Sequence, residues 1–198
     1  RAHPFLLLLA RNMPHVSLGV SDDFKGKSAR GLYGDVIEEL DWSLGEIVKE
    51  LKQLDLEQET LVIFLSENGP PLGELTDQNG GSAQPLRGGK YSNWEGGVRV
   101  PAIMQWPGKI PEGQTDLQVA SLLDLFPTIA NIASVPVPGG IKLDGQNLLA
   151  RITKKDASQQ RPPLLLLFSH HAPGREERRP DGFCPAKTNF SAPLLPIA

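Results

Sequence analysis

The sequence has few of the features that would assign it at once to a special class of protein. It contains one cysteine among 198 residues, Cys184, which excludes a framework of internal disulfide bonds. No apolar run approaches the roughly 18 residues that a membrane-spanning helix needs. The formal net charge of -3 gives no overall basic field, which argues against nucleic acid as the main partner. Any anionic ligand must therefore be bound locally.

An initiator methionine and a signal peptide are also absent from the start of the chain. Arg1 stands almost directly before the first apolar run, and we therefore expect an N-terminal portion to precede it. The composition, with 39% hydrophobic and 22% charged residues, is ordinary for a globular protein that buries a core. It limits the class of protein and leaves the function open.

Apolar periodicity predicts alternating strands and helices. Short continuous apolar runs are typical of strands buried on both faces, and a three-and-four spacing is typical of a helix packed on a sheet. This alternation favours an α/β fold with a mostly parallel sheet flanked by helices. The expected elements are strands at 3–9, 61–65 and 98–106, the last interrupted by Pro101, and helices at 34–54 and 121–133, with Ser121 as candidate N-cap.

The first expected helix is amphipathic. Its apolar stripe consists of Ile37, Leu40, Leu44, Ile47, Val48 and Leu51. Its glutamates are expected on a solvated face rather than as paired acid and base catalysts: Glu38, Glu39, Glu46 and Glu50.

Polar residues with metal-binding chemistry follow the second expected strand. Glu67 and Asn68 stand at its carboxyl end, where ligands collect in open α/β sheets, and they offer the hard oxygens that calcium or magnesium prefers. Lys90 follows two glycines and precedes the Gly96-Gly97 pair, so its loop can approach an anion closely. Together these residues suit an anionic ester bound beside a divalent cation. An ordinary turn and a solvated lysine are the alternative interpretation.

The motifs resemble the sulfatase family, above all the arylsulfatases and N-acetylgalactosamine-6-sulfatase-like enzymes. The resemblance runs from about Pro4 to Phe168 and rests on several motifs in the right order. They are Pro4–Leu9 leading into Met13-Pro-His15, Gly31–Asp35, Ser66–Pro70, Arg87–Lys90, Glu95–Pro101, Trp106–Gly108, Asp124–Thr128 and Asp144-Gly145. The resemblance implies part of an alkaline-phosphatase-like sandwich, with residues 1–160 as the C-terminal part of the catalytic domain.

Family members cleave sulfate esters with a formylglycine, made from the first residue of a Cys/Ser-x-Pro-x-Arg motif. The resemblance therefore implies a formylglycine upstream of this chain. Cys184 is followed by Pro185, one place too early for the motif, and no arginine completes it. We interpret Cys184 as structural or adventitious.

The resemblance also implies a calcium site and a sulfate-binding site. Asn68 matches the family's asparagine ligand for calcium, and Glu67 stands where aspartate is usual, so the affinity for calcium is in question. Lys90 matches the lysine that contacts a sulfate oxygen and stabilises the transition state. His15 matches the sulfate-contacting histidine, which could also protonate the leaving alcohol. Without the motif, a lone loop histidine would be read as a bystander.

Other charged residues are expected to have structural or surface roles. An internal ion-pair scaffold of Arg87, Glu95 and Arg99 is expected to shape the lysine loop. Residues 161–198 are expected to be an irregular C-terminal region that is degenerate or truncated. His170 and His171 are expected at its surface. Asn189 begins a short glycosylation sequon that carries little information alone.

Three functions remain open at this stage. The first is the C-terminal part of a calcium-dependent sulfatase that acts on a sulfated small molecule or sugar and is inactive by itself. The second is a catalytically inactive sulfatase-like fragment or binding module, and the third is a phosphoester hydrolase of the same superfamily. Secreted, periplasmic or lysosomal placement is typical of the family, but no segment here shows the compartment, the oligomeric state or the alcohol that carries the sulfate.

Overall fold

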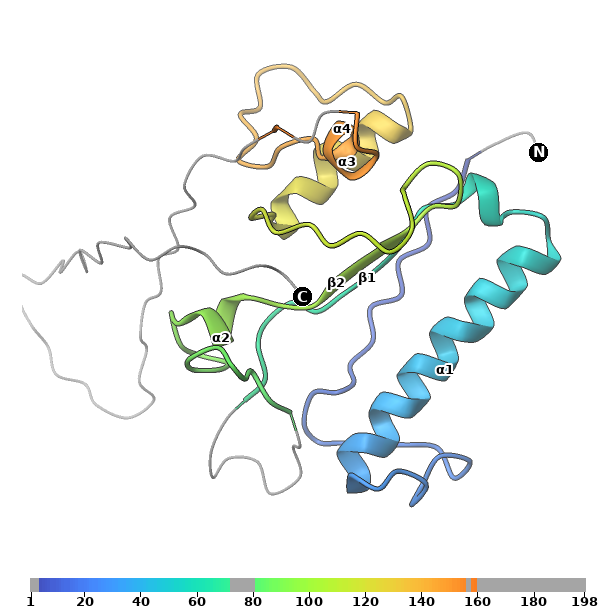
Figure 1. Cartoon of the computed structure of the whole chain (residues 1–198), viewed down its shortest axis with the longest axis vertical. Coiled ribbons are helices and arrows are strands. Elements are labelled where there is room, and N and C mark those ends of the chain that lie inside the picture. Colours follow the sequence, from blue (N-terminus) through green and yellow to red (C-terminus); the bar gives the residue numbers. More distant parts are fainter. Residues whose placement is uncertain (1–3, 72–80, 156–157, 160–198) are drawn as a thin grey trace, which may run out of the picture.

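The computed structural model describes residues 4–71, 81–155 and 158–159. A short antiparallel strand pair lies between a long helix on one side and two shorter helices on the other (Figure 1). The mixture of a small sheet with helices confirms the predicted α/β class. In chain order the elements are α1 (Gly31–Gln53), η1 (Glu57–Glu59), β1 (Val62–Leu65), α2 (Glu95–Val98), β2 (Ala102–Gln105), η3 (Leu122–Asp124), α3 (Leu125–Ile132) and α4 (Leu149–Ile152).

The pairing of β1 with β2 differs from the mostly parallel sheet that was predicted. In the described residues the two strands form an antiparallel pair, with Val62 opposite Gln105 and Leu65 opposite Ala102. In the described residues between them, 66–71 and 81–101, the chain forms the short helix α2 and loops, and no long crossover helix occurs there. Parallel neighbours need such a crossover, whereas a loop can return the chain antiparallel.

The expected strand at 3–9 is wrong for the part that is described. Residues 4–10 have no strand assignment, and the side chains from Phe5 to Leu9 are 49–83% exposed. A strand exists only where a neighbour accepts its hydrogen bonds, and no segment of the described chain pairs with this run. An apolar run predicts burial but does not supply the partner that makes a strand.

Helix α1 confirms the helix predicted at 34–54, shifted by three residues at its start and one at its end. Its N-terminal turn is tied to the preceding loop because the buried Asp35 carboxylate accepts hydrogen bonds from the Gly26 and Ser28 backbone N–H groups, both at 2.7 Å. These two hydrogen bonds hold the pKa of Asp35 below its ordinary value, and the one from Ser28 has the larger effect.

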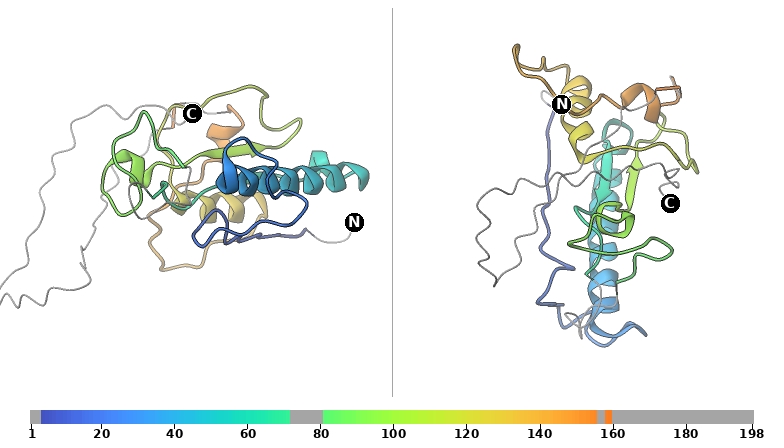
Figure 2. Two further views of the ribbon diagram at one scale, coloured as in Figure 1. Left: turned by 90° about the horizontal axis from the view of Figure 1, so that it is seen from below. Right: turned by 90° about the vertical axis from the view of Figure 1, so that its left-hand side faces the viewer.

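Two details of the predicted α1 pattern need correction. Ile37, assigned to the apolar stripe, is 40% exposed. Glu39, assigned to the solvated face, is partly buried and accepts a hydrogen bond from the Ser21 backbone N–H at 3.0 Å. The partial burial of Glu39 arises because the polar loop before α1 folds back onto the helix (Figure 2), whereas no described segment covers Ile37 to the same extent.

The helix predicted at 121–133 is present as η3 followed by α3. Ser121 is the N-cap, as predicted, and forms a capping box with Asp124, whose Oδ2 accepts from the Ser121 N–H at 2.8 Å. Asp124 is fully buried and its Oδ1 also accepts from Gln146 N–H at 2.7 Å. The next turn is joined in the same way, because Thr128 Oγ1 accepts from Leu148 N–H at 2.9 Å.

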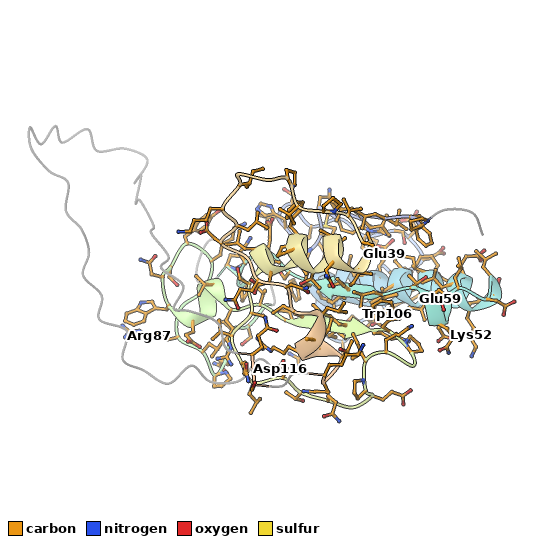
Figure 3. The ribbon with its side chains drawn as sticks, turned by 90° about the horizontal axis from the view of Figure 1, so that it is seen from above. Glu39, Lys52, Glu59, Arg87, Trp106 and Asp116 are labelled. Carbon is orange, nitrogen blue, oxygen red and sulfur yellow. The ribbon has the colours of Figure 1, made fainter. Side chains whose placement is uncertain are left out.

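A buried arginine fastens α4 to the chain before η3. Arg151 is 3% exposed and donates to Asp116 Oδ2 at 2.6 Å, to the Gln118 carbonyl at 2.6 Å and to the Val119 carbonyl at 2.9 Å. Figure 3 shows Asp116 beside α4. Burial raises the pKa of Asp116, but the Arg151 hydrogen bond and charge and the Gln118 N–H outweigh it, so the pKa is lowered overall.

None of the helices within residues 4–71, 81–155 and 158–159 combines the length and the apolarity needed to cross a bilayer. The predictions for 161–198, including those for His170, His171, Cys184 and Asn189, lie outside the described residues.

Candidate active site

His15 and Glu67, which are far apart in the sequence, border one open pocket of about 300 Å³. His15 comes from the loop before α1 and Glu67 from the end of β1. The imidazole can bind an anionic ligand and exchange a proton with it, whereas the carboxylate suits a cation beside that ligand. The other lining residues are Arg11, Asn12, Met13, Val16 and Ser17.

The His15 loop is held by its own backbone and by α1. His15 N–H donates to the Asn12 carbonyl at 3.0 Å, and the His15 ring Nδ1 lies 2.6 Å from the Val16 carbonyl oxygen, a contact that makes Nδ1 the donor. In that tautomer Nε2 is the ring nitrogen that remains to accept a proton or a hydrogen bond. Further along, the bonds to Glu39 and Asp35 anchor the loop to α1.

Glu67 and Asn68 leave the sheet together at the end of β1. Ser66 N–H still donates to the Pro101 carbonyl at 3.3 Å, so the strand pairing extends to the residue before Glu67. Asn68 Nδ2 donates to Glu67 Oε1 at 3.0 Å. This contact brings the carboxylate and the carboxamide into one cluster, and it engages one of the four side-chain lone-pair sites of the carboxylate.

Glycines join this strand end to the lysine loop, which we define as residues 86–98. Gly69 N–H donates to the Gly97 carbonyl at 2.9 Å, and a Cβ on Gly69 would lie 1.8 Å from the Gly96 carbonyl oxygen. On Gly96, a Cβ would lie 2.2 Å from the Gly88 carbonyl oxygen. The close approach that these glycines allow is thus used for backbone packing between two loops of the chain itself.

Lys90 is brought to the same strand end through its backbone. Its N–H donates to the Pro70 carbonyl at 2.8 Å, two residues beyond Asn68. The side chain is half-buried, and its Nζ lies 5.4 Å from the centre of the Tyr91 ring. Lys90 is not among the residues that line the pocket of His15 and Glu67. The two loops adjoin, with the ammonium group resting over the tyrosine.

The predicted ion-pair scaffold is formed in part. Arg99 Nη1 donates to Glu95 Oε2 at 2.7 Å across one turn of α2. Arg87 does not join this pair within the described residues; its guanidinium carbon lies 3.6 Å from the centre of the Trp94 ring instead. The correction follows from geometry, because α2 places Glu95 and Arg99 on one face, while Gly88 turns Arg87 towards Trp94.

The sequence analysis missed four residues that line the pocket: Arg11, Asn12, Val16 and Ser17. Arg11 and Asn12 line the pocket beside His15, and the Arg11 guanidinium contacts Ser43 Oγ on α1. The available signal was their position, immediately before the Met13-Pro-His15 motif. Arginine and asparagine in a loop have no periodicity that separates a pocket residue from a surface residue.

The donor types at the strand end suit calcium, but the set is small. Glu67 and Asn68 supply a carboxylate and a carboxamide oxygen, whereas calcium takes about six to eight oxygen ligands. No group of three His, Cys, Asp or Glu side chains with metal-binding spacing occurs in the part of the chain that the structure describes. The pair therefore fits half of a site in chemistry and needs further donors to complete one.

Comparison with solved structures and family sequences defines the class. A crystal structure titled as Ps i-CgsB in complex with k-i-k-neocarrahexaose superimposes with a TM-score of 0.70 at 34% identity, over 79% of this chain and 35% of that chain. Likeness to such neighbours assigns the chain to the alkaline-phosphatase-like α/β class, as predicted. The family model described as Sulfatase matches residues 1–135, and the chain belongs to the sulfatase family.

The relatives include a steryl-sulfatase and an N-acetylgalactosamine-6-sulfatase, the second of which is of a kind that the sequence analysis named. Human steryl-sulfatase is 43% identical over 155 residues, which cover 77% of this chain and 27% of that protein. Human N-acetylgalactosamine-6-sulfatase is 41% identical over 149 residues, covering 75% of this chain and 28% of that protein. The chain thus spans about a quarter of the length of the curated relatives it matches.

Proposed function

We propose that this chain is the C-terminal part of a sulfuric ester hydrolase and contributes part of its active site. In this proposal residues 1–160 are the C-terminal part of the catalytic domain, and residues 161–198 are a degenerate or truncated C-terminal region. The observation that carries the proposal is the shared pocket of His15 and Glu67, in a chain of the sulfatase family, at the strand end to which the Lys90 loop is bonded.

His15 has the role of contacting the sulfate group and delivering a proton to the leaving alcohol. Its Nδ1 is occupied by the Val16 carbonyl, so Nε2 is the atom that exchanges the proton. A protonated Nε2 donates its hydrogen to the alcohol oxygen as the bond from that oxygen to sulfur breaks. Asn12 and Arg11, which border the same pocket, can orient the ester by hydrogen bonding.

Lys90 has the role of a positive charge for the sulfate oxygens. Its backbone is fixed by Pro70, while the ammonium group lies over Tyr91 on a flexible stem, so it can swing to an anion without moving the loop. A charge placed where negative charge develops lowers the barrier of the reaction.

Glu67 and Asn68 would hold calcium together with further ligands from a longer protein. When bound, calcium supplies a local positive charge that favours the anionic ester and orients it. The formylglycine nucleophile would likewise come from upstream of the chain. The residues of this chain bind, orient and protonate the ester.

The substrate class is a sulfated small molecule or a sulfated sugar. The names of the relatives point to both kinds, since one is a steryl-sulfatase and another an N-acetylgalactosamine-6-sulfatase. In this proposal the His15 imidazole and the Lys90 ammonium group act on the sulfate group, which every sulfate ester carries.

The test is turnover by the complete protein that contains this chain, with an aryl sulfate and the matching aryl phosphate as substrates. We expect hydrolysis of the sulfate, at least about tenfold slower in His15→Ala. A matched control is His171→Ala in the C-terminal region, which we expect to leave turnover unchanged. Preferential hydrolysis of the phosphate would favour a phosphoesterase, and no hydrolysis of either ester would favour the inactive binding module.

A further inference from the structure

The lysine loop contains two pairs of a cation and an aromatic ring. The Arg87 guanidinium carbon lies 3.6 Å from the centre of the Trp94 ring, and Lys90 Nζ lies 5.4 Å from that of Tyr91. Tyr91 is 67% and Trp94 45% exposed. Exposed tryptophan, tyrosine and arginine gathered on one short segment are the residue types that dominate binding surfaces.

The backbone holds these side chains in place. Gly88 has a φ of +77°, and a Cβ there would lie 2.8 Å from Trp94 Cβ, so the indole packs directly against the glycine. The Arg87 carbonyl accepts from Gly96 N–H and the Trp94 carbonyl from Gly97 N–H, both at 2.8 Å. A surface fixed before the ligand arrives loses less conformational entropy on binding.

The backbone conformation of Tyr91 is a second indication that this loop forms a binding surface. Its φ of +70° lies in the left-handed region, which is strained for a bulky side chain and persists only where the surroundings impose it. This conformation turns the ring out to solvent, next to Lys90, instead of into the loop. A strained residue with an exposed ring is typical of a binding position.

The charge of Arg87 remains available to an anion. Within the described residues no carboxylate pairs with Arg87, in contrast to Arg99, which is bonded to Glu95 at 2.7 Å. An arginine stacked on an aromatic ring keeps its N–H groups at the edge of the planar guanidinium, where they form a fork that fits a tetrahedral oxyanion. Figure 3 shows Arg87 at one end of the molecule, far from Lys52 and Glu59.

We propose that Arg87, Tyr91 and Trp94 bind a sulfated oligosaccharide, with sugar rings against the aromatic side chains and a second sulfate on Arg87. The negative faces of aromatic rings attract the weakly positive C–H faces of pyranose rings. The lysine loop is bonded to the strand end through Lys90 and Gly69, so a ligand that extends beyond the pocket can reach both sites. The inference rests on the proposed function only in taking the cleaved ester to be a sulfate. Its test measures binding and does not require hydrolysis.

Single-stranded nucleic acid would also use aromatic and cationic side chains. The formal net charge of -3 and the small number of cations on this loop favour the sugar, because nucleic acid binding rests on many phosphate contacts. Oligonucleotide binding is therefore an outcome that the experiment must separate.

The experiment is calorimetric titration of the 198-residue chain with a chondroitin 6-sulfate hexasaccharide, its desulfated counterpart and oligodeoxythymidylate. We expect binding of the sulfated hexasaccharide at least about tenfold tighter than of the other two probes. Arg87→Lys keeps the charge but loses the planar fork, and Trp94→Phe keeps an aromatic ring but reduces its area. Each change should weaken binding by about threefold to tenfold.

The chain contains a matched control pair. Lys109 Nζ lies 5.9 Å from the centre of the Trp106 ring, whose Nε1 donates to the Gln58 carbonyl at 3.1 Å. Trp106→Phe and Lys109→Ala should leave the affinity unchanged. Each variant is first checked by circular dichroism, so that a loss of binding is scored only where the fold persists.

Three results would overturn the inference: equal affinity for the desulfated hexasaccharide, equal affinity for the oligonucleotide, and unchanged affinity in Arg87→Lys together with Trp94→Phe. If the chain alone gives no heat of binding, the same titration is made with the complete protein. Absence of a heat of binding there also overturns the inference. Failure of the proposed function appears separately, as absent ester hydrolysis with hexasaccharide binding intact.

Discussion

Two regions of the molecule, the α3–α4 region and the region of the pocket and the lysine loop, use polar side chains in different ways. Around α3 and α4, Arg151 and Asp124 are almost fully buried. Arg151 is bonded to three groups from a distant part of the chain, and Asp124 accepts from Ser121 and from the distant Gln146. Around the pocket and the lysine loop, His15, Glu67 and Arg87 are exposed. There it is the backbone and its glycines that make the long-range bonds.

This difference separates residues that hold the fold from residues that can hold a ligand. A buried charge must be satisfied by the protein, because an unpaired one costs several kcal/mol. An exposed charge on a backbone that is fixed by other means costs little and stays available to a ligand. We therefore expect substitutions around the pocket and the lysine loop to lower activity, and substitutions around α3 and α4 to lower stability.

The largest expected effect is on turnover, from Lys90→Ala in the complete protein. We expect kcat for an aryl sulfate to fall by about 10² to 10³, because a charge that stabilises the transition state is removed. The melting temperature should stay within about 2 °C, since Lys90 contacts a ring rather than the core. Lys109→Ala, which removes a lysine from a similar position over Trp106, is the control. Similar kcat values for Lys90→Ala and the parent protein would remove Lys90 from the active site.

In the α3–α4 region, we expect Arg151→Met to lower stability rather than to act directly on turnover. It removes the ion pair with Asp116 and leaves the Gln118 and Val119 carbonyls without this donor, so we expect a loss of about 3 kcal/mol in the free energy of unfolding. Urea denaturation measures it. Arg87→Met, an exposed arginine, is the matched control and should change stability by less than about 1 kcal/mol. A drop in kcat without a change in stability would contradict the structural role of Arg151.

How far the sequence could predict the fold depended on how local each signal was. The helix at α1, the strand at β1 and the Ser121 cap were predictable because periodicity and capping involve residues within a few positions. The strand at 3–9 and the parallel sheet were not, because pairing partners and connections are decided by distant segments.

The candidate site follows the same rule. His15 and Glu67 were predicted from motifs and line one pocket, whereas Arg11 was missed, because it stands before the motif and an arginine in a loop has no periodicity that marks it as a pocket residue. The stacking of Arg87 on Trp94 likewise depends on Gly88, whose positive φ has no counterpart in an apolar pattern. Local signals thus indicate the chemistry of a site, and tertiary structure decides which neighbours complete it.

A smaller effect is expected from acid. The folded pKa values of Asp35 and Asp116 lie below their ordinary values, so both groups contribute stability above a pH of about 4 and lose it as the pH falls through the folded pKa values. Melting temperatures measured between pH 7 and pH 2.5 should therefore decline most steeply at the acid end. Asp35→Asn should flatten that decline, while Asp22→Asn, in the same loop, should leave it as in the parent protein. A decline of equal steepness in Asp35→Asn would show that the hydrogen-bonded carboxylate is not its source.

The smallest expected effect is on the affinity for calcium at the end of β1. Glutamate at position 67 reaches the Asn68 amide at 3.0 Å, so one of its oxygens is partly engaged by the protein instead of being held for a cation. Glu67→Asp shortens the side chain, withdraws the carboxylate from that amide and restores the residue usual in the resembling motif. We expect calcium to bind about threefold to tenfold more tightly to the complete protein, measured by calorimetry, with Glu59→Asp as a control of the same chemistry on η1. An unchanged or weaker calcium isotherm would mean that the glutamate is no handicap, and that the pair at the end of β1 is built around its internal hydrogen bond rather than around a metal ion.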